Sequence, residues 1–150
     1  MTGERLLVVT GAAVAEVSEV PAQVRRLLDT AAEILVVTPI LPGYLEWWAS
    51  DTDRARHEAD ERLNTVLGHM EKMKVPAEGR VGDEDPLMAF DDAVRTFRPD
   101  HVVIALRSEE HADWQERDLV EAVRGRFGLP VTVFDIDPKG HVSGTGGAGS

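Results

Sequence analysis

The stretch that decides the fold runs from Glu78 to Val133, and its first half reads EGRVGDEDPLMAFDDAVRTFRPDHVVIAL (Glu78–Leu106). A short, polar strand comes first. A helix follows at Asp85-Pro86, because Asp is a good N-cap and Pro suits the first helical position. This helix ends before Pro99, and the apolar run His101–Leu106 is typical of a strand buried on both faces. Two strands joined through a helix predict parallel pairing.

The second half of this stretch adds another helix and a closing strand. Asp113 and Glu116 form a capping-box pattern that predicts a helix over Trp114–Phe127, and Gly128 is a typical C-terminal stop. The apolar run Val131–Ile136 then predicts the last strand. The whole stretch therefore alternates strand, helix, strand, helix and strand.

The first half of the chain repeats this alternation. Apolar runs predict buried strands over Arg5–Thr10 and Glu33–Thr38, and a more polar edge strand over Ala77–Val81. Apolar residues at helical spacing predict helices over Val20–Thr30 and Asp51–Lys74. Five strands and four helices in this order predict an α/β protein, a three-layer α/β/α sandwich around a five-stranded parallel sheet.

Composition narrows the classes of function. The chain has 150 residues, 43% of them apolar, which suits one domain with one core. A net charge of −11 argues against nucleic-acid or membrane partners, which need basic patches. There is no cysteine for disulfide or thiolate chemistry, and no signal-peptide pattern precedes the first strand. We therefore expect a cytoplasmic protein.

The last residues differ in composition from the rest. From Pro138 onward the sequence reads PKGHVSGTGGAGS, rich in glycine and poor in apolar residues. Such a segment buries too little to order itself. We therefore predict a domain over residues 1–137 and a disordered tail over 138–150.

Three segments resemble the universal stress proteins. These are Gly82–Ala93 (GDEDPLMAFDDA), with its turn into a helix, Asp100–Ala105 (DHVVIA), with its Asp before an apolar strand, and Pro130–Val133 (PVTV). The resemblance covers about Arg5 to Asp137. It implies a Rossmann-like universal stress protein fold with strand order 3-2-1-4-5, a crevice between the first and fourth strands, and often a dimer through the fifth.

The family's usual ATP-binding residues are missing. The resemblance implies an Asp just after the first strand and a glycine-rich loop after the fourth. Here the first position reads Thr10-Gly11-Ala12-Ala13, and the second, Leu106–Arg117, contains no glycine. Glycines let backbone N–H groups approach phosphate oxygens closely, and the acids of this segment repel a triphosphate. We therefore predict no ATP binding of the usual family type and no bound cofactor.

Five residues should converge at the carboxyl ends of the strands, where open α/β sheets bind ligands. Arg107 could bind a small carboxylate or phosphate through its forked guanidinium, or it could neutralise its acidic neighbours. The candidate crevice consists of Thr10, Gly11, Thr38, Arg107 and Ser108.

Weaker patterns have two interpretations each. Asp53, His57 and Glu61 are spaced to hold a divalent ion on one helix face, but a solvated face has the same pattern. Residues 109–113 (EEHAD) could likewise be metal ligands or a solvated acidic loop at a helix start. We predict no metal. The aromatic loop containing residues 44–48 (YLEWW) could cover the crevice, contact a partner or simply pack on the sheet.

Three hypotheses for function remain. No Ser lies in a Gly-x-Ser-x-Gly turn and there is no Cys, so we do not expect an enzyme. The leading hypothesis is a non-catalytic, dimeric module in stress response or regulation, which acts on a partner protein or a small ligand. The alternative is a diverged binder of AMP or a cyclic nucleotide, in which Arg107 meets the single phosphate. An enzyme or metal protein has the least support.

The predicted dimer has a specific interface. The closing strand Val131–Ile136 has no successor to cover its edge, and an uncovered edge can pair with its twofold mate. We therefore expect a homodimer through this strand.

Overall fold

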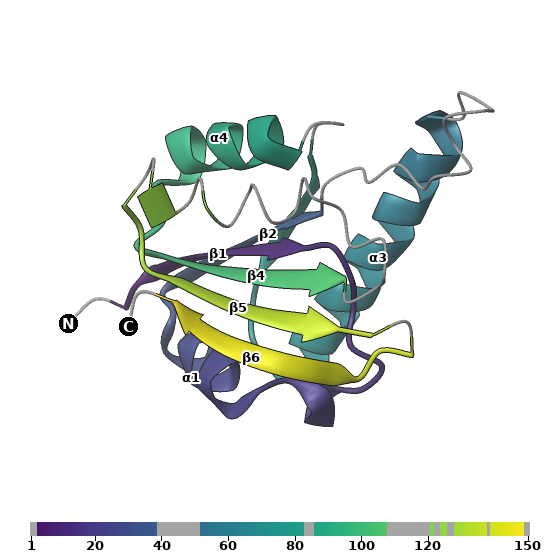
Figure 1. Cartoon of the computed structure of the whole chain (residues 1–150), viewed down its shortest axis with the longest axis horizontal. Helices are drawn as coiled ribbons and strands as arrows, with labels where there is room; N and C mark the ends of the chain where they lie inside the picture. The colour runs from purple at the N-terminus through teal and green to yellow at the C-terminus, as the bar shows by residue number, and fades with distance from the viewer. Residues whose placement is uncertain are drawn as a thin grey trace.

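Five parallel strands form the centre of the molecule, in the order β3-β2-β1-β4-β5 (Figure 1). This order confirms the sequence-based prediction and gives the chain an α/β fold. The computed structural model describes residues 3–38, 52–82, 86–107, 121, 124–125, 128–137 and 139–148.

The central strands are apolar because both of their faces are covered. β1 (Arg5–Thr10) pairs with β2 (Glu33–Thr38) on one side and with β4 (His101–Arg107) on the other. β3 (Glu78–Val81) extends the sheet beyond β2, and β5 (Val131–Ile136) extends it beyond β4. All these bounds agree with the predicted strands to within one residue.

A sixth strand corrects the prediction of a disordered tail. β6 (Val142–Ala148) pairs antiparallel with β5 and forms the edge of the sheet. A parallel strand left at an edge offers unpaired backbone groups, and these can be satisfied by a glycine-rich segment with few side chains to bury. The premise of the predicted dimer interface was therefore wrong, because β6 of the same chain covers the edge of Val131–Ile136.

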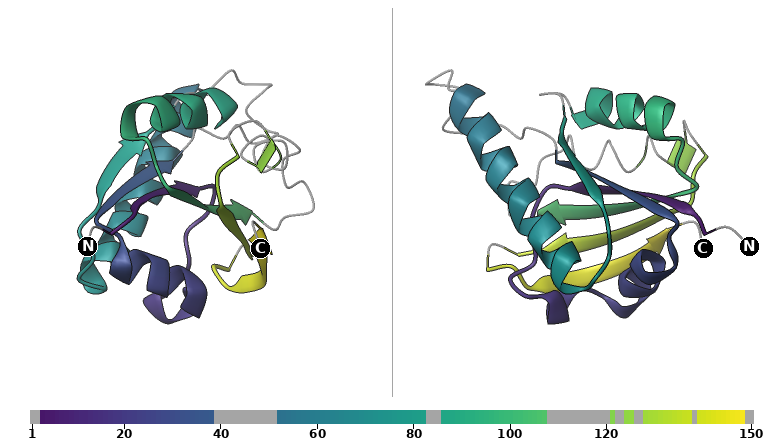
Figure 2. Two further views of the ribbon diagram at one scale, coloured as in Figure 1. Left: turned by 90° about the vertical axis from the view of Figure 1, so that its left-hand side faces the viewer. Right: turned by 180° about the vertical axis from the view of Figure 1, so that it is seen from behind.

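Three described helices cover the two faces of the sheet. α1 (Ala22–Thr30) and α3 (Thr52–Lys72) lie on one face, and α4 (Pro86–Phe97) lies on the other (Figures 1 and 2). α1 begins two residues later than predicted, because a 3-10 turn over Val17–Glu19 precedes it. The predicted helix over Trp114–Phe127 lies mostly outside the described residues.

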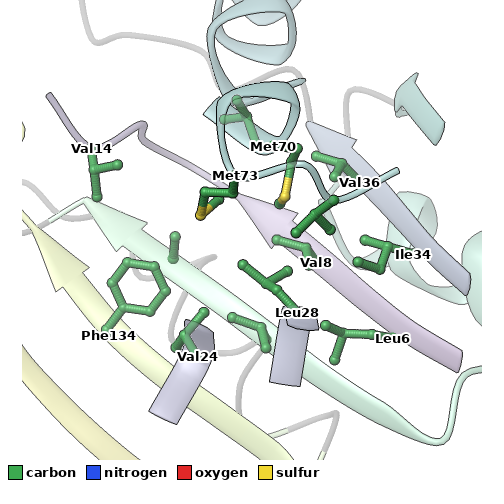
Figure 3. Packing of buried hydrophobic residues seen from close by; sticks show 14 of the residues in the cluster. Leu6, Val8, Val14, Val24, Leu28, Ile34, Val36, Met70, Met73 and Phe134 are labelled. Carbon is green, nitrogen blue, oxygen red and sulfur yellow. The ribbon is translucent and has the colours of Figure 1, made fainter. Parts of the chain in front are cut away.

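Side chains alternate between the two faces and build a core on each. On the face of α1 and α3, Leu6 and Val8 of β1 pack with Val24 and Leu28 of α1 and with Met70 of α3 (Figure 3). On the opposite face, a second cluster contains Leu7, Val9, Leu35, Val37, Phe90 and Ile104. Among the described residues, no helix is long and apolar enough to cross a membrane.

Candidate functional site

Two of the five predicted crevice residues touch each other. Thr10 ends β1 and Thr38 ends β2, and their Oγ1 atoms lie 3.1 Å apart in a hydrogen bond. Both residues are buried, with 3% and 0% of their surface exposed. They meet because β1 and β2 are parallel and pair in register, so their carboxyl ends lie at the same edge of the sheet. One hydroxyl therefore donates its proton to the oxygen of the other.

Gly11 continues the pairing between β1 and β4. Its backbone N–H donates a hydrogen bond of 2.8 Å to the carbonyl of Ala105. The hydrogen bonding between β1 and β4 thus extends to Gly11. The N–H of Gly11 is already used by the sheet and is not free to bind a phosphate oxygen.

The remaining predicted residues lie at or beyond the end of β4. Arg107 is the last residue of this strand, two residues beyond Ala105, and its backbone pairs with Ile136 of β5. Its side chain is outside the described part of the structure. Ser108, the acidic segment 109–113 and the aromatic segment 44–48 are also outside the described residues.

A small cavity lies beside Thr10, between the sheet and the helices α1 and α3. Its volume is about 50 Å³, and its walls are almost wholly apolar. Figure 3 shows Val24, Met70, Met73 and Phe134, four of its lining residues. Such walls offer a ligand few hydrogen-bond partners. Sequence reasoning missed this cavity, because it depends on how the side chains of α1, α3 and the sheet fill the space between them.

Among the described residues that line this cavity, His69 of α3 is the only ionisable one. Burial lowers the pKa of His69, and the nearby charge of Lys72 lowers it further. The neutral imidazole is therefore favoured, which suits an apolar wall.

Two residues of the predicted metal pattern on α3 contact each other. His57 and Glu61 lie 3.1 Å apart, and both side chains are exposed. The side chain of Asp53 is outside the described part of the structure. Among the described residues, no three His, Asp or Glu side chains are grouped closely enough to hold a metal ion.

The turn between β5 and β6 holds the connection that follows β1. The N–H of Ala15 donates a hydrogen bond of 2.9 Å to the carbonyl of Gly140, and His141 lies 3.2 Å from Glu19. Asp137 shapes this turn, because its Oδ1 accepts the backbone N–H groups of Lys139 and His141, each at 2.9 Å. The bond from His141 is the largest of several influences that together lower the pKa of Asp137. The connection between β1 and α1 is thus held by the turn between β5 and β6.

Comparison with known proteins identifies a fold and no closer relationship. No protein-family model matches the chain, and no curated protein matches it. Solved structures do match, among them a universal stress protein family protein from Arabidopsis thaliana with AMP bound. The TM-score is 0.55 at 12% sequence identity, and the match covers 88% of this chain and 91% of that chain. The chain therefore has the fold of a universal stress protein.

Proposed function

We propose that the protein is a non-catalytic binding module of the universal stress type that does not bind ATP in the usual family manner. One observation carries the proposal. At the crevice end of β1 and β2, the hydroxyls of Thr10 and Thr38 bond to each other, and the N–H of Gly11 bonds to Ala105. A triphosphate needs several free N–H donors, and these groups offer none.

Charge supports the same conclusion. The chain carries a net charge of −11, and the segment after β4, SEEHADWQE (Ser108–Glu116), contains four acids, one histidine and no lysine or arginine. At about 4 Å, each contact between like charges costs on the order of 1 kcal/mol in water and several in a protein interior. A ligand with four negative charges is therefore disfavoured over a neutral or singly phosphorylated one.

A regulatory role, a protein partner and a cytoplasmic location belong to this proposal. The absence of cysteine is what supports a location in a reducing compartment. The absence of any nucleophilic motif in the sequence supports an action through binding rather than through catalysis.

A second candidate function is the binding of AMP or a cyclic nucleotide between β1 and β4. The observation in its favour is the structural similarity to a protein solved with AMP bound. One phosphate needs fewer donors than three, and Arg107 stands at the end of β4, where it could supply a positive charge.

Thermal unfolding in the presence of ATP, AMP and cyclic AMP separates these candidates. A ligand at 100 times its dissociation constant adds about 2.7 kcal/mol to the free energy of unfolding, so specific binding is easily seen. We expect no stabilisation by ATP. Stabilisation by AMP that is lost in Arg107→Ala, but kept in the exposed control Arg26→Ala, would favour the second candidate. If ATP stabilises the protein and Thr10→Trp abolishes this effect, the main proposal fails.

A further inference from the structure

The outer edge of β3 is the second edge of the sheet. β6 covers β5 on one side, while no described strand pairs with β3 on the side away from β2 (Figure 2, right). β3 has only four residues, Glu78-Gly79-Arg80-Val81. Its composition is unusual for a strand, since a glycine lies between two opposite charges.

The direction of the backbone groups of β3 follows from one hydrogen bond. The N–H of Gly82 donates to the carbonyl of Thr38 in β2 at 3.0 Å. Along a strand, the backbone groups of successive residues point to alternate sides, so those of Glu78 and Arg80 also point toward β2. The N–H and C=O groups of Gly79 and Val81 therefore point outward, where another strand can bind them.

The two charged side chains of β3 stand on the same face of the sheet. Glu78 is paired in register with Leu35, and Arg80 with Val37, and both of these β2 residues pack in the core under α4. Glu78 and Arg80 are exposed. Neither side chain forms an ion pair within the described part of the chain, so both charges are available to a partner.

From this pattern we propose that two copies of the chain pair through β3, antiparallel, about a twofold axis at Gly79. In this register the outward backbone groups of Gly79 bond to those of Gly79 in the second copy. Glu78 then lies opposite Arg80, and the symmetry creates this pair twice. The Glu78–Arg80 pairs fall at positions without direct backbone bonds, where the side chains of antiparallel strands come closest.

The charges select this register over its neighbours. An axis at Arg80 would place two arginines opposite each other, and an axis at Glu78 would place two glutamates opposite each other. Like charges directly across two strands are destabilising. The sequence Glu-Gly-Arg is therefore self-complementary only when the axis lies at the glycine.

Packing beneath β3 also requires this glycine. A Cβ atom at Gly79 would lie 2.7 Å from a methyl of Leu67 and 2.8 Å from one of Leu63, both on α3. α3 thus packs directly on the backbone of β3 and fixes the strand that the second copy would meet. The interface differs from the predicted one through Val131–Ile136, which β6 occupies, and it requires no ligand.

Short, charged edge strands can also keep proteins monomeric. The two explanations predict opposite results when the charges are changed. Analytical ultracentrifugation of the full chain over a series of concentrations decides between them. The variants are Arg80→Glu, the exchange Glu78→Arg with Arg80→Glu, and the control Arg26→Glu, which makes the same change of charge at an exposed position of α1.

We expect the unmodified protein to form a dimer. Arg80→Glu places acids opposite acids and should raise the dimer dissociation constant roughly tenfold, while the exchange restores opposite charges and returns it to about the original value. Arg26→Glu should leave the dissociation constant nearly unchanged. A monomer at every concentration, an equal effect of Arg80→Glu and Arg26→Glu, or no recovery in the exchange variant would overturn the proposal. The proposed ligand chemistry would stand in each case.

Discussion

Thr10 and Thr38 are buried polar residues at the carboxyl ends of β1 and β2, and their hydroxyls form a hydrogen bond with each other. Their meeting was predictable, because parallel strands bring their carboxyl ends to one edge. Their mutual bond was not predictable, since it depends on the register and on the rotamers that both side chains adopt. The two hydroxyls that were predicted to face a ligand therefore bond to each other.

A double-mutant cycle tests this pair. Thr38→Val removes one partner and leaves the buried Thr10 hydroxyl unsatisfied, which should lower the free energy of unfolding by about 1–3 kcal/mol. Replacing both residues by Val removes the need for the bond, so the double variant should be more stable than the sum of the single changes implies. Urea unfolding measures each value. Strict additivity of the two changes would show that the hydroxyls do not interact.

Arg107 and Ser108 show the limit of prediction for single residues. The end of β4 was predicted to within one residue, because the apolar run His101–Leu106 is typical of a buried strand. The direction of a side chain beyond the end of a strand depends on the loop that follows, and loops lack the periodicity from which strands and helices are predicted. Binding through Arg107 therefore remains a proposal.

At the scale of elements, β6 is where local sequence was misleading. Its composition indicates disorder, because glycine loses much conformational freedom on folding. The free edge of β5 and the turn shaped by Asp137 order it in the structure. Both causes come from parts of the fold outside β6. The central strands, in contrast, can be predicted from their own apolar residues.

Two glycines with positive φ allow a test of whether the turn between β5 and β6 holds the connection that follows β1. Gly140 has φ of 86°, and a Cβ atom there would lie 2.6 Å from the backbone N of Ala15. Gly128 has φ of 61° and nothing within 4 Å. Gly128→Ala should lower the free energy of unfolding by about 1 kcal/mol, from backbone strain alone. Gly140→Ala should lower it by about 1–3 kcal/mol more, because the added Cβ atom also forces apart the turn and the connection after β1.

Chemical denaturation of both glycine variants provides the comparison. Amide hydrogen exchange at Ala15 adds a local reading, since its N–H bonds to Gly140. Faster exchange at Ala15 in Gly140→Ala, but not in Gly128→Ala, is the expected result. Equal losses of stability in the two variants would mean that the turn does not hold this connection.

At the scale of the whole molecule, the order of the five parallel strands was the most predictable feature. It follows from the alternation of buried strands with helices and from the right-handed crossovers that connect parallel strands. The polar edge strand over Ala77–Val81 was also predicted, and β3 lies at an edge of the sheet. The sixth strand, which forms the other edge, was not predictable in this way, and the two edges decide how the chain can associate. Fold and assembly thus depend on different parts of the sequence.

Two partly buried histidines should make the stability of the molecule depend on pH. Burial lowers the pKa of His69, as does Lys72, and burial lowers the pKa of His101 against an opposing effect of Glu4. In the unfolded chain both titrate near the ordinary value of 6.5. As the pH falls below 6.5, the unfolded chain takes up protons before the folded one does, so stability decreases.

Urea unfolding midpoints at about pH 7.5 and about pH 5.5 measure this dependence. The double variant His69→Gln with His101→Gln should lose less stability over this interval than the unmodified protein. Glutamine keeps a polar group near Thr132, whose Oγ1 lies 3.0 Å from Nε2 of His101. An equal loss in both proteins would assign the pH dependence to other groups.

The chain has the fold of a universal stress protein, and we propose that it lacks the family's usual ATP site. Isothermal titration of the protein with ATP and Mg²⁺ is the decisive experiment, with Thr10→Trp as the variant that places a large side chain at the carboxyl end of β1. We expect no saturable heat of binding for either protein. A saturable, one-to-one binding of ATP that disappears in a folded Thr10→Trp variant would contradict it.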